Sequence, residues 1–261
     1  MNHELILSWI PVLGLCMMRP LGAVLFLPMF ASSVLGGSLV RNAIVLLIAL
    51  PAVPVYLHAP ALASLSNVWG FVWMLIVEIS IGLMIGFSAA IPFWAIDMAG
   101  FVIDTLRGAS MANVLNPMLG AQSSVLGILF TQVLAVLFMM NGGFNYLIEA
   151  IYQSFVLFPP GELIHLQSGF GAFFSQEWQT TFELCISFAM PAIVAMLLVD
   201  VALGFVNRSA KQLNVFFLSM PIKCIMSLLL LIISINFSFT YYMEQISTLQ
   251  HHASTLLKVL R

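Results

Sequence analysis

The chain has 261 residues, of which 62% are hydrophobic and only 7% are charged, and its formal net charge is −2. Because about a quarter of the residues in soluble domains are charged, this composition excludes a soluble globular domain and predicts a membrane protein with several helices. The absence of net positive charge excludes a basic protein that binds nucleic acid.

Six apolar stretches predict helices, because backbone amides in lipid must be paired within their own segment. They cover residues 8–30, 39–57, 69–97, 124–158, 182–206 and 215–240. Pro51 and Pro54 end the second stretch. The fourth is too long for one simple span, and the sequence NGGF at 141–144 offers a break into two helices. We therefore expect an all-α, polytopic membrane-type fold with broken helices.

The loops between these stretches differ in charge. Lys or Arg occurs in the loops at 31–42, 98–123 and 207–214, whereas the loops at 58–68 and 159–181 contain neither. The positive-inside rule places the first group in the cytoplasm, including a hairpin turn with Arg208 and Lys211. The C-terminal tail, with Lys258 and Arg261, then breaks the rule. This conflict indicates that the helices are not all conventional lipid-facing spans.

Charged residues inside apolar helices are costly to bury unpaired, and Arg19, Glu78, Asp97 and Asp200 lie in or at the ends of the apolar stretches. If the third helix continues past 97, then Asp97, Asp104 and Arg107 form one charge stripe with an acid–base pair at 104 and 107. The stripe faces a protein-lined or watery interior and responds to protons, or it is a buried ion-pair network that fixes subunit packing. A stripe that takes up and releases protons and a stripe that only forms ion pairs have the same sequence pattern. We favour the second interpretation, in which the ion pairs fix subunit packing.

Small residues on the third stretch predict close helix packing. Gly82 and Gly86 lie four residues apart, which lets a second helix approach the backbone. The pattern leaves open whether that helix belongs to this chain or to another.

The segment DTLRGASMANVLNPMLGAQSS, residues 104–124, is too polar to span a bilayer and too apolar for an ordinary solvated loop. Gly108, Gly120 and Pro117 interrupt regular structure. Met111 and Met118 are flexible apolar side chains in this broken segment, which suits a seal that opens and recloses.

The remaining residues predict neither an enzyme nor a metal or cofactor site. Cys16, Cys185 and Cys224 are an odd, widely spaced set in apolar segments, which indicates buried thiols rather than disulfides or a zinc site. His251 and His252 fit a solvated tail better than a metal clip. The sequence contains no GxSxG, HExxH, P-loop or GxGxxG motif.

The order of several motifs resembles one family. They are RPLGAVLFLPMF, VRNAI, EISIGLMIGFSAAIPFWAIDMAG, NPMLGAQSSVLG, FMMNGGF and DVALGFVNRSAKQLNVFFLSMPIK, within about residues 15–235. In this order and spacing the chain resembles the FliR/SpaR/YscT family, the single-copy inner-membrane component of the type III secretion export apparatus.

The resemblance implies an inner-membrane assembly with five P/R-type subunits, four small Q/S-type hairpin subunits and the switch subunit, and with unfolded secreted proteins in transit. It also implies that residues 1–165 are P/R-like and that residues 166–261 form a Q/S-like hairpin and tail. The resemblance also implies that the assembly is a helical cone partly lifted out of the lipid. This position would explain why the charges of the C-terminal tail do not follow the positive-inside rule.

In that family the loop after the third helix plugs the closed pore. The matching positions here lie within 106–123 and are Gly108, Met111, Asn113, Leu115, Asn116, Pro117, Met118, Gly120 and Gln122. Flagellar relatives often have an acid where this chain has Asn116 and a histidine where it has Gly143, which favours a virulence injectisome. The alternative is an ion-coupled secondary transporter or channel that uses Asp97, Asp104 and Asp200, but the inverted repeats typical of such transporters are not found.

Overall fold

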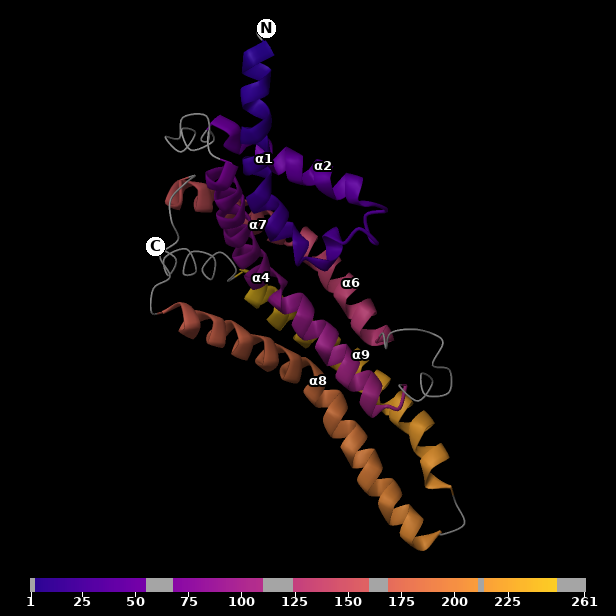
Figure 1. The fold of residues 1–261 in the computed structure, drawn as a ribbon. Coiled ribbons are helices and arrows are strands. Elements are labelled where there is room, and N and C mark those ends of the chain that lie inside the picture. Colours follow the sequence, from indigo (N-terminus) through magenta and orange to yellow (C-terminus); the bar gives the residue numbers. More distant parts are fainter. Residues whose placement is uncertain (1–2, 55–67, 110–123, 160–168, 211–213, 248–261) are drawn as a thin grey trace. The chain divides into compact units, whose positions relative to one another are not determined.

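A computed structural model describes residues 3–54, 68–109, 124–159, 169–210 and 214–247. Within these ranges every regular element is helical, which confirms the all-α prediction. The elements are α1 (His3–Leu25), η1 (Pro28–Phe30), α2 (Ser38–Ala49), η2 (Leu50–Ala52), α4 (Val68–Leu106), α6 (Val125–Met140), α7 (Gly143–Leu157), α8 (Phe170–Ser209) and α9 (Val215–Ser247), shown in Figure 1.

Three stretches of the described helices are long and apolar enough to cross a membrane, namely Val68–Leu106, Phe170–Ser209 and Phe217–Asn236. The bent pair of α6 and α7 raises this number to four if the pair is one span. α4 has 39 residues and α8 has 40. The chain is therefore a helical membrane-type protein, as predicted.

Several predicted helix boundaries were wrong; the third helix, for example, ends at Leu106 rather than at residue 97. The first helix ends at Leu25 rather than at residue 30, because Leu27 precedes Pro28 and adopts an extended conformation with φ −82° and ψ 120°. α8 begins at Phe170 rather than at 182. The mostly polar residues 175–181, SQEWQTT, interrupt its apolar pattern, but helix neighbours such as Gln179 and Glu183 form a side-chain hydrogen bond of 2.8 Å.

The predicted break at NGGF is confirmed. α6 ends at Met140 and α7 begins at Gly143, with a bend of 69° between them. Gly142 has φ +76°, in the left-handed region that favours glycine. A side chain on Gly143 would collide with the ring of Phe138, so the turn requires two adjacent glycines.

The chain divides into two compact units that alternate along the sequence. Unit 1 contains Met1–Ile91, Phe138–Trp178 and Gln245–Arg261, and unit 2 contains Pro92–Leu137 and Gln179–Glu244. The predicted division after residue 165 separates a part that resembles one subunit type from a part that resembles another. It does not describe compact units, so it stays a prediction.

In unit 1, α1 and α4 pack backbone to backbone. A Cβ atom on Gly82 would overlap the carbonyl oxygen of Arg19, and one on Gly86 would lie 2.5 Å from that of Ala23. The contact is reciprocal, because a Cβ atom on Gly22 would lie 2.7 Å from the carbonyl oxygen of Ile79. The helix that approaches Gly82 and Gly86 is therefore α1 of the same chain.

In unit 2, Phe188 of α8 forms the centre of an aromatic cluster. Its ring lies 5.0 Å from Phe130 of α6 and 5.9 Å from Tyr242 of α9, measured between centroids. The hydroxyl of Tyr242 donates to the carbonyl oxygen of Leu184 over 3.1 Å. These contacts join three helices of unit 2.

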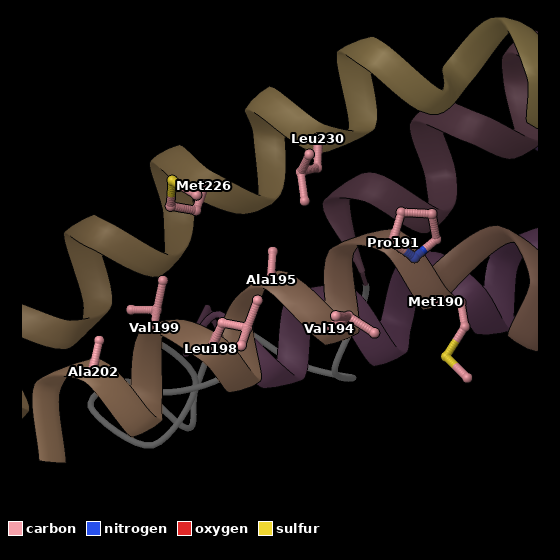
Figure 2. A pocket seen from close by; sticks show the side chains of 9 residues that line it. All are labelled: Met190, Pro191, Val194, Ala195, Leu198, Val199, Ala202, Met226 and Leu230. Atoms are coloured by element: carbon pink, nitrogen blue, oxygen red, sulfur yellow. The ribbon is translucent and has the colours of Figure 1, made fainter.

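An open apolar groove of about 540 Å³ also lies between α8 and α9 of unit 2. Figure 2 shows Ala195 and Val199 of α8 pointing toward Met226 and Leu230 of α9.

Candidate functional site

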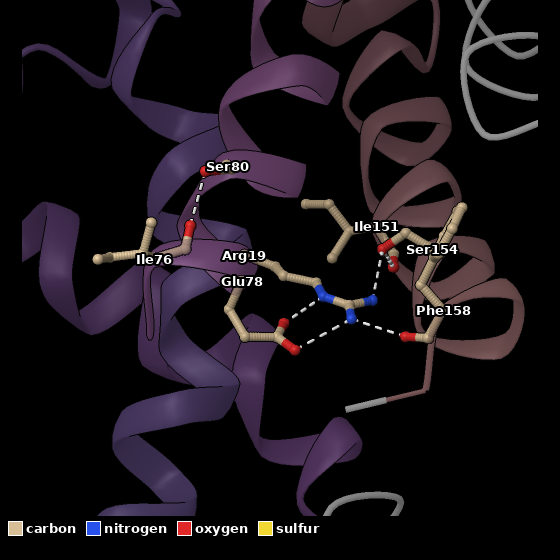
Figure 3. Close-up of polar contacts among 7 residues, drawn as sticks. All are labelled: Arg19, Ile76, Glu78, Ser80, Ile151, Ser154 and Phe158. Carbon is tan, nitrogen blue, oxygen red and sulfur yellow. Dashed lines mark hydrogen bonds and ion pairs between the residues drawn. The ribbon is translucent and has the colours of Figure 1, made fainter. Parts of the chain in front are cut away.

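A buried ion pair joins three helices of unit 1. Arg19 of α1 and Glu78 of α4 have side chains that are 1% and 0% exposed. The Arg19 Nε donates to Glu78 Oε2, and Nη2 donates to Glu78 Oε1 over 3.1 Å (Figure 3). The planar guanidinium therefore holds the carboxylate with two parallel hydrogen bonds, which is the strongest geometry for such a pair.

The remaining donors of Arg19 reach α7 and the residue after it. Nη1 donates to Ser154 Oγ over 3.3 Å, and Nη2 also donates to the carbonyl oxygen of Phe158 over 2.6 Å. The guanidinium carbon lies 4.5 Å from the ring centroid of Phe155, a cation–π contact. Arg19 thus fixes both the position and the rotation of α7, because its contacts all lie on one face of that helix.

A second polar cluster, in unit 2, joins the end of α4 to the start of α6. Asp104 Oδ2 accepts hydrogen bonds from Ser124 Oγ over 2.7 Å and from the backbone N–H of Leu126 over 3.1 Å. Ser124 Oγ in turn accepts from the N–H of Gly127 over 2.8 Å. Ser124 is thus the N-cap of α6, and Asp104 satisfies a further free amide at the same helix end.

Arg107 completes this cluster on α4. Its Nη2 lies 2.7 Å from Asp104 Oδ1, one helical turn away. The two side chains are 13% and 8% exposed. The structure therefore brings Asp104 and Arg107 of the predicted charge stripe together. Asp97, the third member, is exposed on the helix surface beside Gly127.

Gly108 ends α4. Its φ is +88°, its N–H donates to the carbonyl oxygen of Thr105 over 3.1 Å, and the N–H of Ala109 donates to that of Asp104 over 3.0 Å. This pair of hydrogen bonds is a Schellman motif, which needs a glycine at the left-handed position. Gly108 therefore has a fixed role as a helix cap at the edge of the predicted plug.

The other predicted plug residues lie outside the described residues: Met111, Asn113, Leu115, Asn116, Pro117, Met118, Gly120 and Gln122. Lys211, His251 and His252 also lie outside them. Arg208 is exposed in the last turn of α8. In the described part of the chain no three His, Cys, Asp or Glu side chains gather as a metal site would require.

Asp200 pairs with a residue that the sequence analysis did not single out. Lys223 Nζ of α9 lies 2.7 Å from Asp200 Oδ1 of α8, where the carboxylate is 48% exposed. Ser154 and Ser124 were also missed. A serine in an apolar run gives little signal, but Ser124 stands directly before an apolar stretch, where an N-cap is expected.

Sequence comparison matches residues 10–249 to a family described as bacterial export proteins, family 1. The secretion system apparatus protein SsaT of Salmonella typhimurium is 41% identical over 91% of this chain and 92% of its own length. The Yop proteins translocation protein T of Yersinia pestis is 36% identical over 96% and 92%. The flagellar biosynthetic protein FliR of Bacillus subtilis is 33% identical over 62% and 63%.

The family match covers nearly the whole chain, and the first two relatives align along most of both lengths, which confirms the predicted resemblance. The chain therefore belongs to the bacterial export proteins, family 1.

Proposed function

We propose that this chain is a structural and gating subunit of a type III protein-export channel, and that the segment between α4 and α6 is the plug that closes the pore. The family membership and the names of the relatives, which include a secretion apparatus protein and a flagellar biosynthetic protein, support the export role. The longer alignments to the secretion and translocation relatives favour a virulence injectisome over a flagellum.

The observation that carries the gating role is the double attachment of this segment. The Asp104 carboxylate at the end of α4 accepts hydrogen bonds from the Ser124 hydroxyl and from the Leu126 amide at the start of α6. Gly108 turns the chain out of α4 in a defined direction. The two ends of the segment 110–123 are therefore anchored at the same place, where α4 ends and α6 begins. A plug requires such a fixed attachment.

The composition of the segment suits this role. An export channel passes unfolded chains of any sequence, so its seal has to exclude ions without specific hydrogen bonds to the substrate. Met111, Leu115 and Met118 supply flexible apolar contacts, while Pro117 and Gly120 disfavour a continuous helix. Irregular backbone at membrane depth requires surrounding protein or water, which a channel assembly supplies.

The proposal places the chain in the bacterial inner membrane, in one assembly with P/R-type, Q/S-type and switch subunits. The test replaces residues 110–122 with a Gly–Ser linker of equal length and leaves Gly108 and Ser124 unchanged. We expect ion conductance through the assembled complex to rise, while the partner subunits still co-purify. Replacement of residues 161–167 in the same way is the control. Unchanged ion conductance in an assembled complex would contradict the proposed role of this segment as a plug.

An ion-coupled transporter is the rival function. It requires acids that face a substrate path, whereas Asp104 is paired with Arg107 and Asp200 with Lys223. The purified chain alone would have to bind or move a small substrate. We expect it instead to be unstable alone and to co-purify with several small membrane subunits.

A further inference from the structure

The inference concerns the contact between α9 and the base of the segment 110–123. Gly108, where the chain leaves α4, lies against α9, because a Cβ atom on this glycine would lie 3.4 Å from Met220 Cγ and 3.7 Å from Met220 Cε. The preceding residue, Arg107, donates from Nη1 to Cys224 Sγ over 3.9 Å. Met220 and Cys224 are four residues apart and therefore lie on one face of α9. We call these two residues the α9 latch.

Met220 restricts the backbone of Gly108. This glycine has φ +88°, and its wide choice of dihedral angles makes it the position at which the segment 110–123 is most easily redirected. The Met220 side chain fills part of the space around the glycine, so fewer of these conformations are open to it. A methionine side chain is unbranched and flexible, and it can yield when the segment moves. Met220 therefore favours one direction of the chain without fixing it permanently.

Arg107 connects the latch to the rest of the plug base. Its Nη2 lies 2.7 Å from Asp104 Oδ1, and its Nη1 reaches Cys224 Sγ. One guanidinium thus links α9 to the carboxylate that holds the start of α6. The contact with sulfur is the weaker of the two, because a thiol is a poor acceptor whereas the carboxylate is charged.

Among the described contacts at the plug base, those with α9 are the easiest to break. The four residues that make them are all half-buried, so their separation exposes little surface that water does not already reach. By contrast, the Asp104 side chain is 8% exposed and accepts two hydrogen bonds from the start of α6. α9 is held to α8 farther along its length by the buried Tyr242, which donates to the carbonyl oxygen of Leu184. A movement of the plug base therefore costs least where α4 meets the latch.

We propose that the α9 latch positions Gly108 in the closed channel and releases the end of α4 when the channel opens. The inference rests on the proposed export function and deepens it, because it names the contact that holds the plug base in place. Met220 and Cys224 are positioning residues, since neither has to touch the exported chain.

The first test loosens the latch with Met220→Ala. Its control is Met226→Ala on the same helix, a residue that is 36% exposed and lines the groove shared with α8. We expect Met220→Ala to raise the resting ion conductance of the assembled complex about tenfold, since an open state populated at about 0.1–10% leaves room for such a shift. The control should conduct like the unchanged protein, and partner subunits should co-purify with both variants. Unchanged conductance of Met220→Ala in an assembled complex would overturn the inference.

The second test locks the latch. In a variant with Cys16→Ala and Cys185→Ala, Arg107→Cys is bridged to the native Cys224 by a bifunctional thiosulfonate. The Arg107 side chain itself reaches Cys224, so a spacer about as long as an arginine side chain joins the two thiols. The bridge is broken again by a reducing agent, which lets each sample serve as its own reference.

A matched bridge ties α9 to α8 instead of α4. Asp200→Cys and Lys223→Cys replace two side chains that lie 2.7 Å apart, and Cys224→Ala removes the thiol next to them. If Arg107→Cys fails to assemble, Ala109→Cys bridged to Met220→Cys joins the same two helix ends.

We expect the bridge between positions 107 and 224 to stop the export of a secreted protein into membrane vesicles that carry the assembled complex, and reduction to restore it. The bridge between positions 200 and 223 should leave export unchanged. Continued export with the first bridge complete would overturn the inference, because the plug would then move without its base. Equal loss of export with both bridges would also overturn it.

Failure of the latch and failure of the plug are distinguishable. The conductance of the linker variant of residues 110–122 does not depend on either bridge, so an unchanged value there contradicts the plug itself. Export through a bridged complex contradicts only the release of α4 from α9.

Discussion

The two arginine–carboxylate clusters are built in opposite ways. In unit 1 the acid and the base come from different helices, 59 residues apart, and Arg19 of α1 is the shared centre that contacts both α4 and α7. In unit 2 Asp104 and Arg107 are three residues apart on α4, and the carboxylate is the centre, because it also holds Ser124 and Leu126.

The difference shows which residue of each pair makes the contacts between helices, and therefore which residue is more important for stability. Arg19 is a five-donor group that a carboxylate, a hydroxyl and a carbonyl share, so its loss leaves a buried negative charge. Loss of Asp104 leaves the Leu126 amide of α6 unpaired, while the partly exposed Arg107 can still reach water.

The largest expected effect is that of Arg19→Met. Breaking a buried pair by removing one partner costs about 3–5 kcal/mol, so we expect the chain to disappear from the co-purified complex. Arg19→Met combined with Glu78→Met should restore most of the yield, because an apolar pair replaces the charges without leaving one unpaired. Normal yield of the single variant would show that the cluster does not hold unit 1 together.

Asp104→Ala should have the next largest effect. It removes two hydrogen bonds to a charged acceptor, each worth about 1.5–3 kcal/mol. We expect the complex to assemble with raised ion conductance, since the base of the segment 110–123 is loosened. Asp104→Asn keeps an acceptor oxygen and should leak less. The control is Asp97→Ala on the same helix, and equal leakage from it would contradict the role of Asp104.

Two glycines of α1 give a matched pair for the packing beside Arg19. Gly22→Ala inserts a methyl group against the backbone of α4, which typically costs about 1–3 kcal/mol. Gly14→Ala on the same helix meets nothing within 4 Å and should stabilise by about 0.5–1 kcal/mol. The thermal unfolding midpoint of the purified complex should therefore move in opposite directions. A shift in the same direction would contradict the close α1–α4 approach.

The smallest effect is expected from Asp200→Asn. Its pair with Lys223 is half-exposed, and such pairs are worth about 0–1 kcal/mol. The thermal unfolding midpoint should shift little. A loss of stability as large as that of Arg19→Met would show that solvent exposure does not determine how much each ion pair contributes to stability.

The sequence predicted the helices and the break at NGGF well, because apolar length and adjacent glycines are local signals. Arg19 and Glu78 were recognised as costly charges, but not as partners, since 59 residues separate them and only the Gly22–Gly82 packing brings them together. The extension of α8 to Phe170 was missed because the mostly polar residues 175–181 interrupt the apolar pattern.

The site was predicted in part. The pairing of Asp104 with Arg107 followed from helical spacing, but Ser124 lies across the segment 110–123 and its contact with Asp104 depends on the tertiary fold. Gly108 was assigned to the plug for its conformational freedom, and the structure shows that this freedom is used to end α4. The position of the remaining plug residues stays a prediction.

The lengths of α4 and α8 limit how these helices can be placed in a membrane. Helices of 39 and 40 residues are about 60 Å long along their own axes, twice the hydrocarbon thickness, so one direct crossing uses about half of each. Each helix must therefore place its remaining turns outside the hydrocarbon layer, in the headgroup region, in water or against protein.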